Sequence, residues 1–496
     1  MENTHQNVFI TGRAGTGKST LLNYFRRQTK KKIAVLAPTG IAAINVQGQT
    51  IHSFFKFKPN VTLQSIKKNN PDDKKNIYKK LEAIVIDEIS MLRADVLDCM
   101  DRFLRLNGKT AEEPFGGLQI IFIGDLYQLP PVVTSQEKEI FLSQYKSPYF
   151  FSAKSFENFK MEFIELEKIY RQQDERFISL LNSIRNKTTT DEDIALLNQR
   201  VNPDYIPEEY YICLTPKNVE AGAINEERLD QLKGKMHTFD AHIKGSFGRE
   251  YYPTKPTLNL KRGSQVMMIN NDNRHRWVNG TMGKVLRFER DEDEVVVVVE
   301  LEDGQEVDVT PFTWEIHKLF LETEAIQSET MGSFTQYPLS LAWALTIHKS
   351  QGKTFNKVVL DIGQGAFMPG QVYVALSRCT TFEGLTLKKP IQKKHIWLDY
   401  EVVKFITNFH YQDSNNKLPL DKKVEFIEDS VKRNRSLEIV YLKANNEKST
   451  RTITPIFIGT LSYKEKTYIG MKAFCHQSQE ERVFRVDRIL NMKSIS

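Results

Sequence analysis

Short apolar runs alternate with amphipathic stretches over the first 165 residues. The apolar runs are typical of parallel strands buried on both faces of a sheet, and they cover residues 8–10, 33–37, 83–87 and 118–124. Helical spacing occurs at 19–27 and 94–106, so this part predicts a parallel α/β domain. A lysine- and asparagine-rich stretch at 56–80, interrupted by Pro59 and Pro71, breaks the alternation. It predicts an insertion that projects from the sheet.

A second α/β pattern begins near residue 165, with strands expected at 211–215 and 357–361. Between about 273 and 324 the pattern becomes all-β, with strands expected at 284–288, 295–301 and 306–309. Five consecutive valines at 295–299 favour a sheet over a helix, and Asp303-Gly304 supplies a hairpin turn. We interpret this stretch as a small barrel inserted into the second α/β domain. A helical connector is expected at about 393–435, followed by strands at 437–442, 452–458 and 466–470.

The composition of the 496 residues, 40% hydrophobic and 26% charged, is that of a globular protein with ample material for cores. No apolar run approaches the roughly 20 residues of a membrane span, and the first strand begins too early to leave room for a signal peptide. The four cysteines are scattered without a CxxC pair, so neither a zinc site nor a disulfide framework is indicated. We expect a bacterial cytoplasmic protein with no membrane partner.

The net charge of +7 is concentrated at the end of the chain. From residue 431 onward there are 13 basic and 6 acidic residues, while the preceding 430 residues are balanced. This imbalance favours a polyanionic partner for the tail, although an ordinary basic domain without such a partner remains an alternative.

Residues 12–20, with the sequence GRAGTGKST, match the phosphate-loop pattern and lie between an expected strand and an expected helix. Backbone N–H groups of such a loop surround phosphate oxygens at the positive end of the helix. Lys18 would reach the β- and γ-phosphates, and Ser19 would bind Mg²⁺. The expected nucleotide-binding residues of the loop are Gly12, Ala14, Gly15, Thr16, Gly17, Lys18, Ser19 and Thr20.

Further candidates for the same chemistry follow the other apolar runs. Asp87 can hold Mg²⁺ opposite Ser19, and Glu88 can orient and deprotonate the attacking water. Gln128 lies before two prolines that stiffen its loop, so its amide can report whether the γ-phosphate is present. From their local pattern alone, Arg171 and Arg378 would be surface arginines, which leaves a catalytic role open.

Together these segments resemble a Pif-type helicase (petite integration frequency family), a superfamily-one DNA helicase related to the RecD enzymes. The resemblance spans nearly all of residues 1–395. Order and spacing match at 12–20, 37–55 (APTGIAAINVQGQTIHSFF), 87–90 (DEIS), 115–132, 166–174 (LEKIYRQQD), 339–355 and 371–378.

The resemblance implies two RecA-like domains, at 1–165 and at 166–272 with 325–395, and ATP with Mg²⁺ in the cleft between them. The stretch 56–80 would be a wedge element and 273–324 a Src-homology-type barrel. Catalytic residues would be Lys18, Glu88 and Gln128 from one domain and Arg171 and Arg378 from the other. Gln351 and Gly352 would also contact the nucleotide.

Single-stranded DNA would cross the top of both domains. The residues implied to contact it are Pro38, Thr39, Thr50, His52 and Phe54 on the first domain, and Thr346, His348, Lys349 and Ser350 on the second. Family members usually carry a helix with an adenine-reading glutamine well upstream of the phosphate loop. This chain has only about eleven residues there, so Gln6 or His5 is the expected substitute, and selectivity for ATP stays open.

The tail at about 435–489 resembles a WYL domain, a β-rich module common in bacterial regulators, although Val440 replaces the tryptophan of the name. The resemblance implies a groove for single-stranded nucleic acid or a nucleotide, bound through Tyr441, Arg451, Arg482 and Arg485. The alternative is that Tyr441 and Phe484 are ordinary core residues. Residues 396–434 would connect this domain to the rest.

The function implied is an ATP-dependent DNA helicase that moves 5′→3′ on single-stranded DNA and opens forked and duplex DNA, with quadruplexes and RNA–DNA hybrids as further substrates. It would act as a monomer, in replication, repair or telomere maintenance. The alternative from another class is a nucleotide-gated regulator that binds nucleic acid without motor activity. A packaging or RNA-directed motor would differ only in its substrate.

Overall fold

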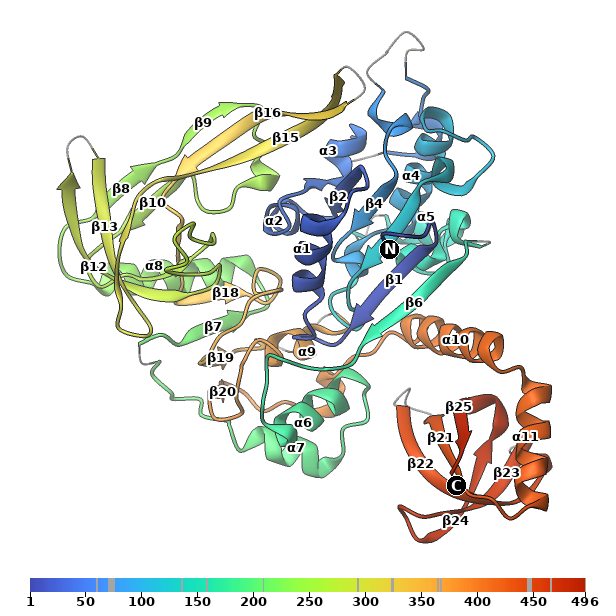
Figure 1. Cartoon of the computed structure of the whole chain (residues 1–496). Coiled ribbons are helices and arrows are strands. Elements are labelled where there is room, and N and C mark those ends of the chain that lie inside the picture. Colours follow the sequence, from blue (N-terminus) through green and yellow to red (C-terminus); the bar gives the residue numbers. More distant parts are fainter. Residues whose placement is uncertain are drawn as a thin grey trace. The chain divides into compact units, whose positions relative to one another are not determined.

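The computed structural model describes residues 1–495 except 59–60, 70–75, 135–136, 158, 208, 292–293, 323–324, 364, 366–367, 444–447 and 464–465. The chain divides into two compact units, shown in Figure 1. Unit 1 comprises Met1–Ile184 with Thr189–Trp397, and unit 2 comprises Arg185–Thr188 with Leu398–Ser496. No helix in the described part of the chain has the length and hydropathy needed to cross a membrane.

Unit 1 begins with a six-stranded parallel sheet in the order β3-β2-β4-β5-β1-β6 (Figure 1). Its strands are β1 (Asn7–Gly12), β2 (Ile33–Ala37), β3 (Gln49–Thr50), β4 (Ala83–Ile86), β5 (Gln119–Ile123) and β6 (Met161–Leu166). Its helices are α1 (Lys18–Gln28), α2 (Gly40–Asn45), α3 (Ile51–Phe55), α4 (Ala94–Asn107) and α5 (Lys138–Gln144). Every residue of β4 and β5 is buried, which explains why these strands are continuous apolar runs. The predicted parallel α/β domain is confirmed.

The insertion expected at 56–80 packs against α4 where it is described. Short 3-10 helices form at Leu63–Ser65 and Ile77–Lys79. The side chain of Asn107 accepts a hydrogen bond from the Asn69 N–H at 2.7 Å, and its backbone carbonyl accepts one from the side chain of Asn76 at 2.9 Å. The described part of the insertion is therefore held to the first domain by hydrogen bonds to Asn107 of α4. Both prolines of this stretch lie outside the described residues.

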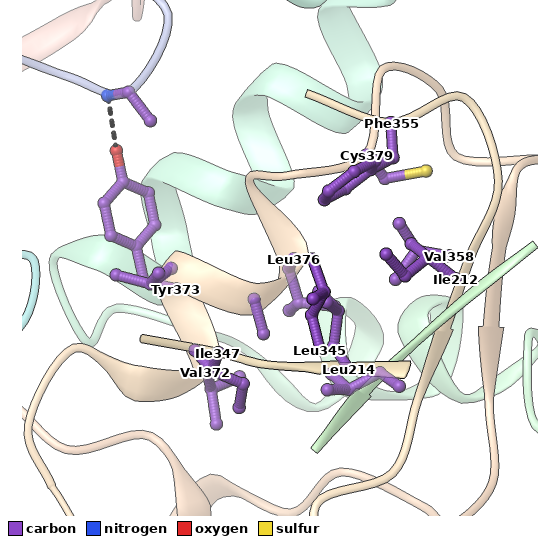
Figure 2. Packing of buried hydrophobic residues seen from close by; sticks show 14 of the residues in the cluster. Ile212, Leu214, Leu345, Ile347, Phe355, Val358, Val372, Tyr373, Leu376 and Cys379 are labelled. Carbon is purple, nitrogen blue, oxygen red and sulfur yellow. Dashed lines mark hydrogen bonds between the residues drawn. The ribbon is translucent and has the colours of Figure 1, made fainter. Parts of the chain in front are cut away.

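A second, four-stranded parallel sheet follows in the order β18-β7-β19-β20. Its strands are β7 (Ile212–Thr215), β18 (Ala344–Thr346), β19 (Val358–Leu360) and β20 (Leu385–Leu387). The helices around it are α6 (Glu175–Arg185), α7 (Asp191–Asn198), α8 (Asn218–Gln231) and α9 (Gln371–Leu376). Figure 2 shows Leu214 and Leu345 from neighbouring strands packed beside Leu376 of α9 in the core of this part. The second α/β pattern is thus confirmed, with its strands formed by distant segments.

The all-β interruption is larger than expected. A five-stranded antiparallel sheet has the order β14-β13-β12-β11-β17, a three-stranded sheet the order β15-β16-β9, and β10 pairs with β8. The strands are β8 (His237–Asp240), β9 (His242–Gly245), β10 (Thr257–Leu260), β11 (Gln265–Met268), β12 (Met282–Asp291), β13 (Glu294–Leu301), β14 (Glu306–Val309), β15 (Phe312–Glu322), β16 (Ala325–Gln336) and β17 (Leu339–Leu341).

The three strands predicted in this region correspond to β12, β13 and β14, but a closed barrel is not confirmed. Among the described strands, β14 and β17 are the edges of the five-stranded sheet. The predicted limits 273–324 also miss β11 and β17 and cut the β15–β16 hairpin. These limits depend on pairing between distant segments, which the local valine-rich pattern does not reveal.

Unit 2 contains α10 (Tyr400–Lys417), α11 (Leu420–Lys432) and an antiparallel sheet in the order β24-β23-β22-β21-β25. The strands are β21 (Leu437–Leu442), β22 (Lys448–Tyr463), β23 (Lys466–Cys475), β24 (Glu480–Arg485) and β25 (Ile489–Ser494). Ile427 of α11 is fully buried in the same core as Leu437 and Ile453. The predicted helical connector is therefore helical, but it is part of the tail's own core.

Candidate nucleotide and DNA sites

The phosphate loop connects β1 to α1 at the carboxyl edge of the first sheet. Gly15 and Gly17 have φ angles of 78° and 84°, a left-handed conformation that favours glycine. A Cβ on Gly15 would lie 2.5 Å from the Cβ of Arg171, whereas a Cβ on Gly17 would meet nothing within 4 Å. Gly17 thus serves the turn, and Gly15 also allows the Arg171 segment to approach.

The residues expected to bind phosphate lie in this loop and at the start of α1. The Lys18 ammonium donates hydrogen bonds to the carbonyls of Gly12 and Arg13, at 2.7 and 2.9 Å. The hydroxyl of Thr16 donates to the Arg13 carbonyl at 2.9 Å and stiffens the turn. Ser19 and Thr20 are exposed at the start of α1, where helix N–H groups attract anions. The loop and the start of α1 therefore bring the Lys18 ammonium and the first helix N–H groups together, as a triphosphate requires.

Asp87 and Glu88 follow β4 at the same sheet edge. Burial raises the pKa of Asp87 to about 7, the charge of Glu88 adds to this, and Lys18 opposes it. Burial also raises the pKa of Glu88, against the charges of Lys18 and Arg378. A carboxylate with a raised pKa is a stronger base, which suits proton abstraction from water. The amide of Gln351 donates to Glu88 Oε2 at 2.9 Å and orients it.

The Mg²⁺ expected here would be held by oxygen atoms. Ser19 offers an exposed hydroxyl, and Asp87, close enough to Lys18 to interact electrostatically, offers a carboxylate. Among the described residues, no group of three or more acidic, histidine or cysteine side chains is placed so that it could hold a metal ion. One carboxylate plus a hydroxyl, completed by phosphate and water oxygens, is a usual Mg²⁺ arrangement, so the residues present fit this ion.

The two candidate arginines lie close to each other and to Glu88. Arg378 is only 1% exposed, and burial lowers its pKa to about 9, with the charge of Arg171 adding to this. Its guanidinium donates to the Val374 carbonyl and the Ser377 hydroxyl, both at 2.9 Å. Arg171 donates to the Ser377 carbonyl at 3.1 Å. Each arginine interacts electrostatically with Glu88, so the structure brings the two together with the predicted base.

Two residues that sequence reasoning missed support this site, one by hydrogen bonds within the second domain and one by a hydrogen bond to the first. The amide of Gln172 is buried and donates to the carbonyls of Ser377 and Cys379, at 3.1 and 2.9 Å. The hydroxyl of Tyr373 accepts a hydrogen bond from the Ala14 N–H at 3.0 Å, seen as the dashed line in Figure 2. Gln172 directly follows Arg171, and Tyr373 lies in the 371–378 segment, so adjacency to predicted residues was the available signal.

Gln128 lies close to the same junction. Its side chain is buried, and its amide donates to Asp125 Oδ2 at 3.4 Å. The Tyr373 hydroxyl also reaches Asp125 Oδ2, at 3.5 Å. A Cβ on Gly370, before α9, would lie 2.6 Å from the Gln128 carbonyl. The loop carrying Gln128 is therefore packed directly against the second sheet's helix.

Two further nucleotide candidates differ in position. Gly352 is near the arginines, since its carbonyl accepts from Arg171 Nη2 at 3.4 Å. Gln6 precedes β1, and its carbonyl accepts from the Gln119 amide at the amino end of β5. A six-residue strand of about 20 Å separates Gln6 from the phosphate loop. Gln6 thus lies at the opposite edge of the sheet, which argues against its predicted contact with adenine.

The predicted DNA contacts of the first domain cluster after β2 and β3. Pro38 and Thr39 follow β2, and the Thr39 and Thr50 side chains cap α2 and α3. The hydroxyl of Thr50 is hydrogen-bonded to that of Tyr251. His52 is half-buried, and burial lowers its pKa.

Phe54 has a different role from the one predicted. Its ring is 5% exposed and packs edge-on against Phe55 and Tyr78, at centroid distances of 4.9 and 5.5 Å. No face of the ring is left for a base. Phe54 is therefore a core residue, enclosed by neighbouring aromatic rings.

On the second domain, the segment after β18 holds the remaining candidates. Lys349 is exposed and His348 is half-buried, with its pKa lowered by burial. Thr346 is buried, and Ser350 is buried with its hydroxyl donating to the Ile347 carbonyl at 2.8 Å. Ser350 thus shapes the turn in this conformation. Thr346 and Lys349 line a cavity of about 810 Å³, together with residues of α2, α8 and the inserted strands.

The four tail candidates do not form one cluster in unit 2. The guanidinium of Arg485 forms an ion pair with Asp487 at 2.6 Å and lies over the ring of Tyr468. The backbone N–H of Arg485 donates a hydrogen bond to the Tyr441 hydroxyl at 3.4 Å. Tyr441 contacts buried Phe484 edge-on, so the core alternative holds for Phe484 and in part for Tyr441.

The other two tail arginines have separate partners. Arg451 donates to the hydroxyl of Ser449 at 3.3 Å and to the sulfur of Cys475 at 3.4 Å. Arg482 pairs with Glu480. The side chains around Tyr441 and Arg485 are thus the more compact candidate site, and Tyr411 of α10, close enough to interact electrostatically with both, is a member that the sequence did not indicate.

Comparison with known proteins finds three family models that match the chain, one of which, described as a helicase model, covers residues 295–414. The PIF1-like helicase model matches residues 1–194, and the WYL domain model matches residues 422–494. The ATP-dependent DNA helicase Pif1 of Bdellovibrio bacteriovorus is 33% identical over 396 residues, covering 77% of this chain and 84% of that protein. Human ATP-dependent DNA helicase PIF1 is 34% identical over 393 residues, but the chain spans only 58% of its length.

Solved structures of a Bacteroides Pif1 helicase share the fold. The unliganded form has a TM-score of 0.74 at 38% identity and covers 81% of this chain and 92% of that one. The form bound to single-stranded DNA has a TM-score of 0.59 at the same identity and coverage. These matches confirm two RecA-like parallel sheets in unit 1, and the WYL match accompanies a β-rich tail. The chain belongs to the PIF1-like helicase family.

Proposed function

We propose that the chain is an ATP-dependent DNA helicase that moves 5′→3′ along single-stranded DNA and unwinds duplex DNA. The observation that carries this proposal is the meeting of two half-sites. Lys18 and Glu88 come from the first sheet, Arg171 and Arg378 from the second, and Glu88 interacts electrostatically with Lys18 and both arginines. A site divided between two domains links hydrolysis to their relative motion.

Each residue has a role in the cycle. Lys18 and the loop N–H groups would bind the β- and γ-phosphates, and Glu88, oriented by Gln351, would take the proton of the attacking water. Arg171 and Arg378 would offset the charge that develops on the transferred phosphoryl group. Mg²⁺ held by Ser19 and Asp87 would neutralise charge on the β- and γ-phosphate oxygens. Gln128, beside Asp125 and Tyr373, would sense whether the γ-phosphate is present.

The substrate follows from the cavity and from the relatives. Thr346 and Lys349 line the cavity with Ile41 and Asn45 of α2, so candidate DNA contacts of one domain face the other domain. A Bacteroides relative is known bound to single-stranded DNA. Opening a base pair costs on average ~1.4 kcal/mol of stacking free energy, which ATP hydrolysis exceeds. ATP hydrolysis therefore supplies enough free energy, and the structure has to couple that hydrolysis to movement along DNA.

Steady-state ATP hydrolysis, measured with and without single-stranded DNA, tests this function. We expect strong stimulation by DNA, because the arginines of the cleft and the DNA-facing segment belong to one connected part of unit 1. Lys18→Ala is the blank, since it removes the phosphate-binding cation. A rate of ATP hydrolysis that does not change when DNA is added would favour the nucleotide-gated regulator instead. Strand displacement on a fork with a 5′ tail, compared with a 3′ tail, tests the polarity.

The WYL-matching tail is proposed to bind single-stranded nucleic acid or a nucleotide at Tyr441 and Arg485. Its excess of basic residues supports a phosphate-bearing ligand. One chain supplies both halves of the nucleotide site, which supports a monomer as the working unit, and we place it in the bacterial cytoplasm.

Removing residues 398–496 should weaken DNA binding and reduce its salt dependence. The expected loss is about 0.7 in the slope of log affinity against log salt for each single-strand phosphate that the tail neutralises. Fluorescence anisotropy at several salt concentrations measures the slope, and DNA-independent ATP hydrolysis checks that unit 1 has folded. An unchanged slope would mean that the tail binds something other than this DNA.

A further inference from the structure

Lys353 lies where the nucleotide site meets the DNA-facing cavity, and no motif assigned it a role. It follows Gly352 and lines the same cavity as Thr346 and Lys349. The backbone carbonyls of Gly352 and Lys353 accept hydrogen bonds from the two arginines proposed to be catalytic. Arg171 Nη2 donates to the Gly352 carbonyl at 3.4 Å, and Arg378 Nη1 donates to the Lys353 carbonyl at 3.3 Å. Residues 352–353 therefore connect the two arginines of the proposed nucleotide site to the cavity.

The side chain of Lys353 reaches the loop before β12. Its ammonium donates to Asn279 Oδ1 at 2.6 Å. The amide of Asn279 in turn donates to Asn45 Oδ1 at 3.1 Å, at the end of α2. The chain of hydrogen bonds thus runs from the second α/β domain, through the loop before β12, to the helix that Thr39 caps.

The surroundings of this ammonium favour an anion. Among the described residues, its hydrogen-bond acceptor is a neutral amide, and no carboxylate forms an ion pair with it. Burial alone lowers the pKa of Lys353 to about 8, so its positive charge is costly here and uncompensated. A phosphate oxygen would provide the missing negative charge and a stronger, charge-assisted hydrogen bond than the amide does.

We propose that Lys353 is a further contact to a DNA phosphate, that it exchanges Asn279 for this phosphate when DNA enters the cavity, and that the arginines of the nucleotide site set its position. This inference rests on the proposed helicase function. When a γ-phosphate attracts Arg171 and Arg378, their bonds to the Gly352 and Lys353 carbonyls must break or move with them. The grip on DNA would then change with the state of the nucleotide.

Lys353→Gln tests the charge, because a glutamine can still donate to Asn279. We expect the slope of log affinity against log salt for a labelled oligothymidylate to fall by about 0.7, the value of one single-strand phosphate contact. Lys353→Arg should restore the slope, and Asn279→Ala should leave it unchanged because the charge stays. Lys160→Gln is the matched control, since this exposed lysine precedes β6 at the opposite edge of the first sheet.

A second measurement tests the coupling. The affinity for the same oligonucleotide is measured without nucleotide and with ADP-aluminium fluoride. The ratio of these two affinities should be closer to one in Lys353→Gln than in the wild-type protein. A wild-type slope in this variant, or a failure of arginine to restore it, would overturn the inference, as would an unchanged nucleotide ratio. If the wild-type protein itself shows no stimulation of ATP hydrolysis by DNA, the proposed function fails instead. Thermal unfolding of each variant identifies a folding defect. If Lys353→Gln has such a defect, the salt dependence of DNA binding is measured again with Lys353→Met.

Discussion

Replacement of Arg378 by alanine should lower ATP turnover by roughly 10³–10⁵-fold, the range measured when an arginine that stabilises phosphoryl transfer is removed. The physical reason is its position. The guanidinium is buried, lies close enough to Arg171 and Glu88 to interact with both, and is placed by the Val374 carbonyl and Ser377 hydroxyl. A positive charge excluded from water acts strongly on the charge that develops in the transition state.

The affinity for ATP should change far less than turnover, because Lys18 and the loop N–H groups supply most of the phosphate contacts. Nucleotide titration and single-turnover hydrolysis separate the two quantities. Arg200→Ala is the matched control: Arg200 also donates to carbonyls in the second domain, those of Leu385 and Glu383, which belong to neither the phosphate loop nor the Glu88 segment. Turnover of Arg378→Ala within a few-fold of wild type would exclude the proposed role.

Glu88→Gln should bind ATP and hydrolyse it roughly 10²–10⁴-fold more slowly, the usual contribution of a general base. Glutamine has nearly the same shape and can still accept the hydrogen bond that Gln351 donates to Oε2. It cannot accept a proton from water. The substitution therefore removes the chemistry while keeping the packing of a residue that the structure holds at φ 49°.

Trapping of unhydrolysed ATP on the variant, together with a phosphate-release assay, measures this effect. Gln351→Ala is the companion variant, because it leaves the Glu88 carboxylate in place but removes its orienting donor. We expect it to have the smaller loss. If Glu88→Gln turns over at a near-normal rate, another group activates the water.

The local chemistry of this chain was predictable from the sequence. Strands such as β2 (Ile33–Ala37) and β21 (Leu437–Leu442) match the expected ranges, because apolar runs and β-branched residues act over neighbouring positions. The phosphate loop is likewise a continuous segment, so its glycines, Lys18 and Ser19 determine its chemistry directly. The spacing of the family motifs then assigned the two arginines, which their local pattern would have left on the surface.

The remaining features depend on contacts between residues far apart in the chain. Phe54 fits a DNA-contacting motif, yet it is buried and its ring packs edge-on against Phe55 and Tyr78. Tyr373 reaches the phosphate loop across more than 350 positions. The limits of the inserted strands follow the pairing of β11 with β17, and no single segment contains that information.

The sequence alone determined the class of fold, the nucleotide chemistry and the family, because these are written in local patterns of apolar, glycine and charged residues. The tertiary structure alone decided which residues share a site. It separated Gln6 from the phosphate loop, divided the tail arginines among different partners, and joined Lys353 through Asn279 to the opposite domain. The physical reason is that hydrogen bonds and burial depend on distance in space, which the fold creates between residues that the sequence holds apart.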